Sequence, residues 1–195
     1  MKNKTLVLGI GNTLLGDEGA GVYAVRVLQE RHADRADLEL LDGGTLSFTL
    51  AGPIEEADNL IVIDATQLQD APGTVRVFEG EDMDRFLGGH RKSSVHEVSL
   101  LDLLTVARLA EALPARRALI GIQPEYLDWS DTPTANVARA IPAACDLVMD
   151  LIERWRSEPG SRAPSGDASA SREQGPREAG MRTSASRSRP LERGG

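Results

Sequence analysis

Three side chains of the kinds that bind divalent metal ions stand where secondary-structure elements are expected to begin or end. Glu18 follows an apolar run and a glycine-rich turn, Asp64 ends a second apolar run, and His96 lies near the start of an amphipathic stretch. Carboxylate oxygens and an imidazole nitrogen suit zinc, nickel or a related ion, and they leave coordination positions open for water or substrate. The residues therefore predict a metal site without thiolate ligands, which would hold its metal loosely.

Each of these residues also has an ordinary structural explanation. Asp17 and Glu18 can be the N-cap and a first-turn acid of the helix that follows them. Asp64 can cap the loop after its strand, and His96 lies within a tetrapeptide, Ser94-Val95-His96-Glu97, that matches the S-x-x-E capping box. The three explanations are independent of one another, whereas a shared position at one edge of a sheet accounts for all three residues at once.

The elements that would position these side chains alternate between strand and helix. We expect strands at residues 4–10, 38–41, 59–64, 74–78 and 117–122, and helices at residues 19–32, 45–57, 94–113 and 134–155. Right-handed crossovers then give an α/β fold with a mostly parallel sheet and helices on both faces. Because no helix is expected between the strands at 59–64 and 74–78, the latter is predicted to be antiparallel.

In such a fold, ligands bind outside the carboxyl ends of the parallel strands. Glu18, Asp64 and His96 are all expected at that edge. If His96 lies in the first turn of its helix, the helix dipole keeps the imidazole neutral, as a metal ligand must be.

Two parts of the chain have the composition of surface or unstructured segments. Residues 79–93 are acidic, then glycine-rich and basic, and we expect a mobile surface segment. Within it, residues 79–92 are expected to be a loop that moves when substrate binds. Residues 157–195 consist mainly of Ser, Gly, Pro, Ala, Arg and Glu, with almost no large apolar residues, and we expect them to be disordered. The folded domain is therefore expected to cover residues 1–156.

Composition narrows the class of protein further. The 195 residues are 41% hydrophobic but only 4% aromatic, which predicts one domain with an aliphatic core. The net charge of −8 argues against nucleic-acid or membrane-surface partners. Cys145 is the single cysteine, so no intramolecular disulfide can form; it is expected to be a buried small hydrophobe in a protein of the reducing cytoplasm. No apolar run approaches the ~20 residues that cross a bilayer.

Several other catalytic and binding motifs fail at one position. Leu14 stands where a dinucleotide-binding fingerprint needs its third glycine. Gly11 and Gly16 have the spacing of a P-loop, but Asp17 follows in place of lysine. Leu100 replaces the second histidine of an H-E-x-x-H helix. These departures disfavour a nucleotide-binding enzyme and a zincin-type peptidase.

Taken together, the motifs resemble those of the [NiFe]-hydrogenase maturation proteases. The pattern G-x-G-N-x-L-x-x-D-E-x-x-G-V runs from Gly9 to Val22. The similarity continues through Asp42-Gly43-Gly44-Thr45, the strand that ends at Asp64, Pro72-Gly73-Thr74, Ser94-x-His96 and Gly121-x-Gln123-Pro124-Glu125. It covers roughly residues 4–155, the whole of the expected folded domain.

The resemblance implies a three-layer α/β/α fold with a twisted five-stranded sheet. It also implies a cytoplasmic endopeptidase, grouped with the aspartic-type peptidases, that removes a short C-terminal peptide from the nickel-loaded precursor of a [NiFe]-hydrogenase large subunit. In that family Glu18, Asp64 and His96 would bind a metal ion, namely the nickel of the substrate, and no organic cofactor is implied. Asp42 would contact the substrate or support a metal ligand.

Two questions stay open at this stage. No serine or cysteine nucleophile is evident, so Asp64 or Glu18 is expected to activate a water molecule for attack on the peptide bond. The same fold and site would also suit a non-catalytic chaperone or binding module that senses the metal. The hydrogenase precursor is the expected partner in both cases, and a compact domain with one cysteine allows a monomer.

Overall fold

The computed structural model describes residues 4–89 and 98–158. The chain divides into two units, residues 1–163 and 164–195, and every described residue belongs to the first unit. The strands are β1 (Thr5–Ile10), β2 (Leu38–Gly44), β3 (Asn59–Ala65), β4 (Val75–Glu79) and β5 (Arg116–Ile122). The helices are η1 (Gly16–Gly19), α1 (Ala20–Arg31), η2 (Phe48–Leu50), α2 (Ala51–Glu55), α3 (Glu81–Gly89), α4 (Leu100–Leu109) and α5 (Ala135–Ser157).

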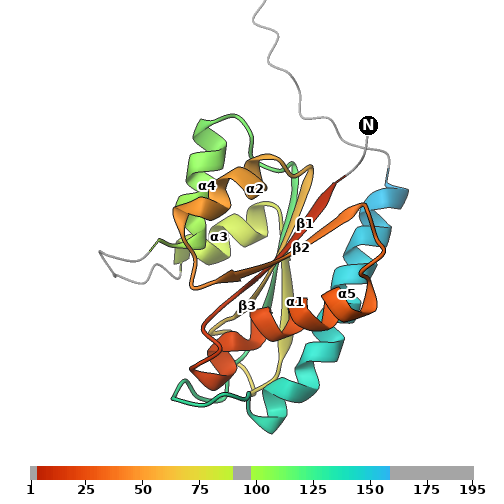
Figure 1. Cartoon of the computed structure of the whole chain (residues 1–195). Coiled ribbons are helices and arrows are strands. Elements are labelled where there is room, and N and C mark those ends of the chain that lie inside the picture. The colour runs from red at the N-terminus through yellow and green to blue at the C-terminus, as the bar shows by residue number, and fades with distance from the viewer. Residues whose placement is uncertain (1–3, 90–97, 159–195) are drawn as a thin grey trace, which may run out of the picture. The chain divides into compact units, whose positions relative to one another are not determined.

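The five strands form one sheet in the order β2-β1-β3-β5-β4. The pairs β1–β2, β1–β3 and β3–β5 are parallel, and β4 runs antiparallel to β5. Helices α1 and α5 cover one face, and α2, α3 and α4 cover the other (Figure 1). The predicted three-layer α/β fold is therefore confirmed, including the antiparallel strand at the sheet edge.

The side chains of β1 alternate between the two cores. Val7 packs among residues of α1 and α5, whereas Leu6, Leu8 and Ile10 pack on the opposite face. All six residues of β1 are buried. A strand covered on both faces needs apolar residues at every position, which explains the continuous apolar run that marks it in the sequence.

The expectation of a mobile segment at residues 79–93 is wrong for residues 79–89. Glu79 ends β4, and α3 follows with Met83 fully buried in the core. The ring of Phe86 stacks on that of Phe78, with 4.1 Å between the ring centroids. The acids and the glycine pair of this stretch look like a surface loop in sequence, but the few apolar side chains among them anchor a helix. Residues 90–93 lie outside the described residues.

Charged contacts hold α3 against the sheet. Asp84 accepts hydrogen bonds from Nε and Nη2 of Arg117 on β5, at 3.0 and 2.6 Å, and from Nη2 of Arg108 on α4, at 2.8 Å. The Arg117 side chain is 11% exposed. The hydrogen bonds from Arg117 lower the pKa of the Asp84 carboxyl, and its partial burial opposes that shift. One acid on α3 therefore links this helix to β5 and to α4.

Asp84→Asn is expected to lower the free energy of unfolding at pH 7 by about 2 kcal/mol, because it weakens hydrogen bonds to two arginines. A depressed native pKa stabilises the fold above the unfolded carboxyl pKa of about 3.9, and this contribution is lost as the pH falls through the native pKa. Urea unfolding at pH 7 and at successively lower pH should show the difference between wild type and variant shrinking. Asp82→Asn, on the same helix but exposed, is the control and should change stability by less than about 0.5 kcal/mol. A constant difference at all pH values would contradict the ionic explanation.

Helix α4 is shorter than the helix expected at residues 94–113. It begins at Leu100, and its capping box is formed by Ser99 and Asp102, three residues apart like the expected pair Ser94 and Glu97. It ends at Leu109, and Glu111 then adopts a left-handed backbone conformation with φ of 56°. Residues 94–97 lie outside the described residues.

The helix expected at residues 45–57 also begins later than the apolar spacing indicates. Leu46 has a left-handed backbone with φ of 45°, and Ser47 caps η2, which leads into α2.

Within the two described ranges, no helix combines the length and apolar character that a membrane span requires.

Candidate functional site

The carboxyl ends of the central parallel strands bring two of the predicted site residues to one edge of the sheet. Gly9 of β1 pairs with Asp42 of β2 on one side and with Ile63, the residue before Asp64, on the other. Asp42 and Asp64 therefore flank the end of β1, separated by two strand spacings of about 4.8 Å each. Asp64 is half-buried and Asp42 is exposed.

Close backbone contacts place Glu18 at the same edge. Gly11 has φ of 135°, and a Cβ atom there would lie 1.8 Å from the carbonyl oxygen of Glu18. A Cβ atom on Gly21 would lie 2.1 Å from the carbonyl oxygen of Ile63. Only glycines allow η1 and the start of α1 to press this closely on the ends of β1 and β3. The glycine-rich turn seen in the sequence therefore serves to bring Glu18 next to the end of β3.

The Glu18 side chain is half-buried, and in the part of the chain that the structure describes it takes part in no hydrogen bond or ion pair. Glu18 does lie in the first turn of η1, as its explanation as a first-turn acid expects. Neither acid is an N-cap, because the N-cap positions of η1 and α1 are Leu15 and Gly19. Two carboxylates at one edge, one of them without a protein partner there, can attract a divalent cation or accept a proton from water.

The third expected ligand, His96, lies outside the described residues. Helix α4, at whose start His96 was expected, begins at Leu100. Within residues 4–89 and 98–158, no group of three or more metal-ligating side chains comes together. The set Glu18, Asp64 and His96 consequently stays a prediction.

Asp17 has a role that its position next to Glu18 does not suggest. It is 1% exposed and accepts hydrogen bonds from the backbone N–H of Glu125 at 2.8 Å and of Thr134 at 2.7 Å. The Thr134 hydroxyl donates to it at 3.1 Å, and the N–H of Tyr126 lies at 3.4 Å. Asp17 is thus the anchor of the loop between β5 and α5. The partners are more than a hundred residues away in sequence, so local patterns could not reveal this role.

Asp42 is engaged in local contacts. Its Oδ2 atom pairs with Nη2 of Arg26 on α1 at 3.2 Å, and its Oδ1 atom accepts the N–H of Gly44 at 3.0 Å. Both contacts fix the exposed end of β2, the edge strand. They leave Asp42 accessible at the rim of the carboxyl edge rather than at its centre.

Gln123 is a further residue at this edge whose role the sequence does not show. It follows β5 and is buried, and its Oε1 atom accepts the N–H of Leu68 at 2.7 Å. Its amide nitrogen donates to Oε1 of Gln67 and to the carbonyl of Pro124, each at 3.1 Å. Gln123 therefore holds the loop that follows Asp64 in place.

Cys145 is buried on α5, and its thiol lies 3.5 Å from the carbonyl oxygen of Ala24. Burial raises the pKa of this thiol to about 11. A thiol that stays protonated and inaccessible cannot be a nucleophile at neutral pH. The expectation that Cys145 is a buried small hydrophobe is confirmed.

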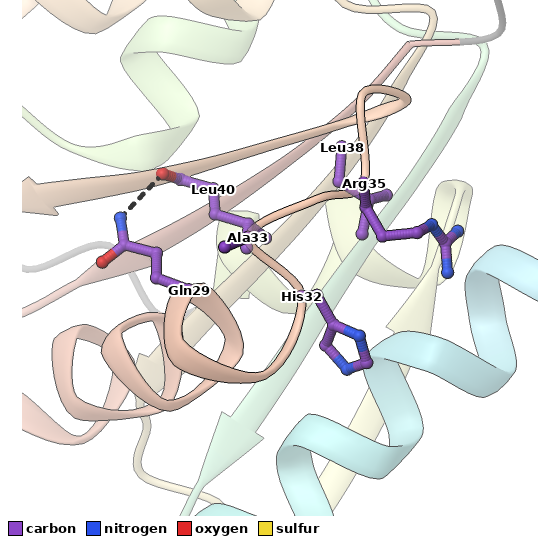
Figure 2. A pocket seen from close by; sticks show the side chains of 6 residues that line it. All are labelled: Gln29, His32, Ala33, Arg35, Leu38 and Leu40. Carbon is purple, nitrogen blue, oxygen red and sulfur yellow. Dashed lines mark hydrogen bonds between the residues drawn. The ribbon is translucent and has the colours of Figure 1, made fainter.

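A shallow pocket of about 290 Å³ lies away from the carboxyl edge. Figure 2 shows its lining side chains, which come from the end of α1, the following turn and the beginning of β2: Gln29, His32, Ala33, Arg35, Leu38 and Leu40. The Gln29 amide donates to the Leu40 carbonyl at 2.9 Å. Because β2 starts here and ends at Asp42-Gly43-Gly44, the pocket and the candidate site lie toward opposite ends of the sheet.

Comparison with known proteins identifies the family. The model of the hydrogenase maturation protease family matches residues 22–151, a range that includes Asp42, Asp64 and His96 and begins just after Glu18. The hydrogenase expression/formation protein HupD of Bradyrhizobium diazoefficiens is 38% identical over 154 residues, which cover 78% of this chain and 80% of HupD.

Two comparisons with Escherichia coli proteins point to the same family. The hydrogenase 2 maturation protease is 35% identical over 150 residues, covering 76% of this chain and 90% of that protein. The solved structure of the hydrogenase maturating endopeptidase HybD matches with a TM-score of 0.71 and 34% sequence identity, covering 77% of this chain and 93% of HybD. The glycine-rich turn, the five-stranded sheet and these similarities lead to one conclusion: the chain belongs to the hydrogenase maturation protease family and is an endopeptidase.

Proposed function

We propose that this endopeptidase removes a short C-terminal peptide from the nickel-loaded precursor of a [NiFe]-hydrogenase large subunit, in the cytoplasm. The observation that carries the proposal is the position of Glu18 beside the end of β3, where Asp64 lies, in a chain of the hydrogenase maturation protease family. Ligands of parallel α/β folds bind at that edge. The net charge of −8 fits a protein partner better than a nucleic acid or a membrane surface. We propose that the enzyme acts as a monomer.

The nickel in this proposal belongs to the substrate, and Glu18, Asp64 and His96 are its proposed ligands on the protease. The Glu18 carboxylate is half-buried and has no partner among the described residues, which suits a group that receives a cation from outside. Two carboxylates and an imidazole can bind nickel, and without a thiolate the binding would be weak enough to release it. Recognising the metal would confine cleavage to precursors that have been loaded. No organic cofactor is part of the proposal.

The proposed reaction uses a carboxylate as the base, as in aspartic-type peptidases. Asp64 or Glu18 takes a proton from a water molecule, whose oxygen attacks the scissile carbonyl carbon. The carbon–nitrogen bond then breaks, the leaving amine takes a proton, and the new C-terminus of the large subunit is a carboxylate. The nickel ion can polarise the carbonyl as a Lewis acid. Asp42, accessible at the rim, is proposed to contact the substrate or to support a metal ligand.

The test is cleavage of a large-subunit precursor prepared with and without nickel, followed by intact-mass measurement. We expect only the nickel-loaded precursor to lose a short C-terminal fragment, because the proposed ligands engage the metal. Equal cleavage of both forms would contradict the role of nickel. Binding of the loaded precursor without any loss of mass would contradict the protease activity and favour a metal-sensing chaperone.

A further inference from the structure

Four large apolar side chains are exposed where the loop after β1 meets the loop between β5 and α5. They are Leu14, Tyr126, Leu127 and Trp129, and we call this set the apolar platform; Trp129 is 78% exposed. The two loops pair directly, since the N–H of Ser130 donates to the carbonyl of Leu14 at 3.1 Å. Leu15 and Ser130 form a parallel bridge. Leu14 and Trp129 therefore occupy neighbouring register positions in the two loops.

Hydrogen bonds to Asp17 and Tyr23 fix the backbone of the two loops that carry the platform. Buried Asp17 anchors both ends of the β5–α5 loop, through the N–H groups of Glu125 and Thr134. The hydroxyl of Tyr23 lies 3.1 Å from the carbonyl oxygen of Thr13 and 3.0 Å from that of Asp131, so it can donate to either loop. A surface whose backbone is this well fixed loses little conformational entropy when a partner binds.

Exposed aromatic side chains on neighbouring loop residues are unfavourable in water, and they are typical of protein–protein interfaces. The platform also adjoins η1, which carries Glu18. A Cβ atom on Gly16 of η1 would lie 3.1 Å from Cβ of Ser130, so the loop and η1 are in close contact. A protein seated on the platform would consequently reach the edge of the sheet at which Glu18 and Asp64 lie.

The charges around the platform indicate the chemistry of the partner. Residues 124–134 contain the acids Glu125, Asp128 and Asp131 and neither lysine nor arginine. All three acids are exposed. A complementary surface has an apolar centre with basic side chains at its rim.

We propose that the apolar platform docks the folded body of the large-subunit precursor, through an apolar patch with a basic rim, and that Asp17 is the positioning residue that holds the platform. This inference rests on the proposed function, because it takes the precursor as substrate. Docking the folded body fixes one peptide bond at the carboxyl edge, which lowers the entropic cost of reaching the reactive geometry. The platform therefore selects the partner, whereas the edge residues act on the bond.

The test is steady-state cleavage of the nickel-loaded precursor by wild type, Trp129→Ala and Tyr126→Ala. A central aromatic residue of an interface contributes enough that its loss should raise KM about 30-fold. The value of kcat should change less than about 2-fold, since neither side chain takes part in the reaction. Leu109→Ala is the matched control: Leu109 is 81% exposed on α4, outside the platform, and its loss should leave KM unchanged.

Asp17→Asn tests the positioning role. Its amide group would turn a donor toward backbone N–H groups that need an acceptor, so we expect a raised KM together with faster chymotrypsin cleavage after the platform residues. If this variant fails to fold, the two aromatic variants still decide the proposal.

The possible failures are distinguishable. If wild type does not cut the precursor, the proposed function fails. If wild type cuts and both aromatic variants have wild-type KM, the platform proposal fails alone. A wild type that sediments as a dimer and becomes monomeric in Trp129→Ala would overturn the assignment of the partner, because a second copy of the chain would occupy the platform.

Discussion

Asp64→Asn is expected to slow cleavage of the nickel-loaded precursor by about 10³-fold or more. The substitution keeps the size of the side chain but removes its charge, so the residue could no longer serve as the proposed base or as a proposed ligand of a divalent cation. Removing a general base alone costs about 10² to 10⁴ in rate, and weaker metal contact would add to that loss. Single-turnover cleavage read by intact mass, with enzyme in excess over precursor, measures the rate directly.

Glu153→Gln is the control for this experiment, because Glu153 is an exposed acid on α5. It removes the same charge from the chain and should leave the rate unchanged. Thermal unfolding of Asp64→Asn should confirm that the fold persists, since Asp64 lies at the end of β3 rather than in the core. Cleavage at the wild-type rate by a folded Asp64→Asn protein would remove Asp64 from the site.

Gly21→Ala is expected to destabilise the fold by about 3 kcal/mol or more, a large part of the stability of a typical domain. The added methyl group would lie 2.1 Å from the carbonyl oxygen of Ile63 and 2.5 Å from that of Ile10. These are backbone atoms of two central strands, so they cannot rotate away as a side chain can. Helix α1 would have to move off the sheet, and Glu18 would move with it. Urea unfolding followed by circular dichroism measures the change.

Gly88→Ala is the matched control, since it makes the same exchange in helix α3. A Cβ atom on Gly88 would meet nothing within 4 Å. Alanine favours a helix over glycine by up to about 1 kcal/mol, so this variant should be as stable as wild type or slightly more stable. If Gly21→Ala unfolds at the wild-type urea concentration, α1 does not rest on the strands as closely as the geometry requires.

The sheet was predictable because its signals are local. Buried strands such as β1 and β3 are continuous apolar runs, and the missing helix before residues 74–78 identified the antiparallel strand β4. Helix α3 was missed because distant partners stabilise it: Arg117 pairs with Asp84, and Met83 enters a core that other elements build. The start of α4 was misplaced because two serine–acid pairs with the same spacing compete, and their local patterns are equivalent.

The residues of the candidate site also differ in whether local sequence could reveal their roles. Glu18 and Asp64 stand out in sequence because acids follow an apolar run that ends in a glycine turn or a strand end, and the structure brings their backbone segments together. The separate role of Asp17 could not be predicted from the local sequence. Its hydrogen-bond partners lie in the loop after β5, more than a hundred residues further along the chain. Adjacent acids of one dipeptide therefore differ: Asp17 binds the protein's own backbone, and Glu18 is proposed to act at the site.

The strand order also has a consequence for synthesis on the ribosome. Strand β5 lies between β3 and β4, yet it is made after both of them. Until β5 has emerged, the nascent chain carries two strands whose hydrogen-bonding edges lack their shared partner. Unpaired strand edges are the features through which incomplete chains aggregate. Translation beyond residue 122 is therefore the step that closes the sheet, and chains released before it would be the ones most in need of a chaperone.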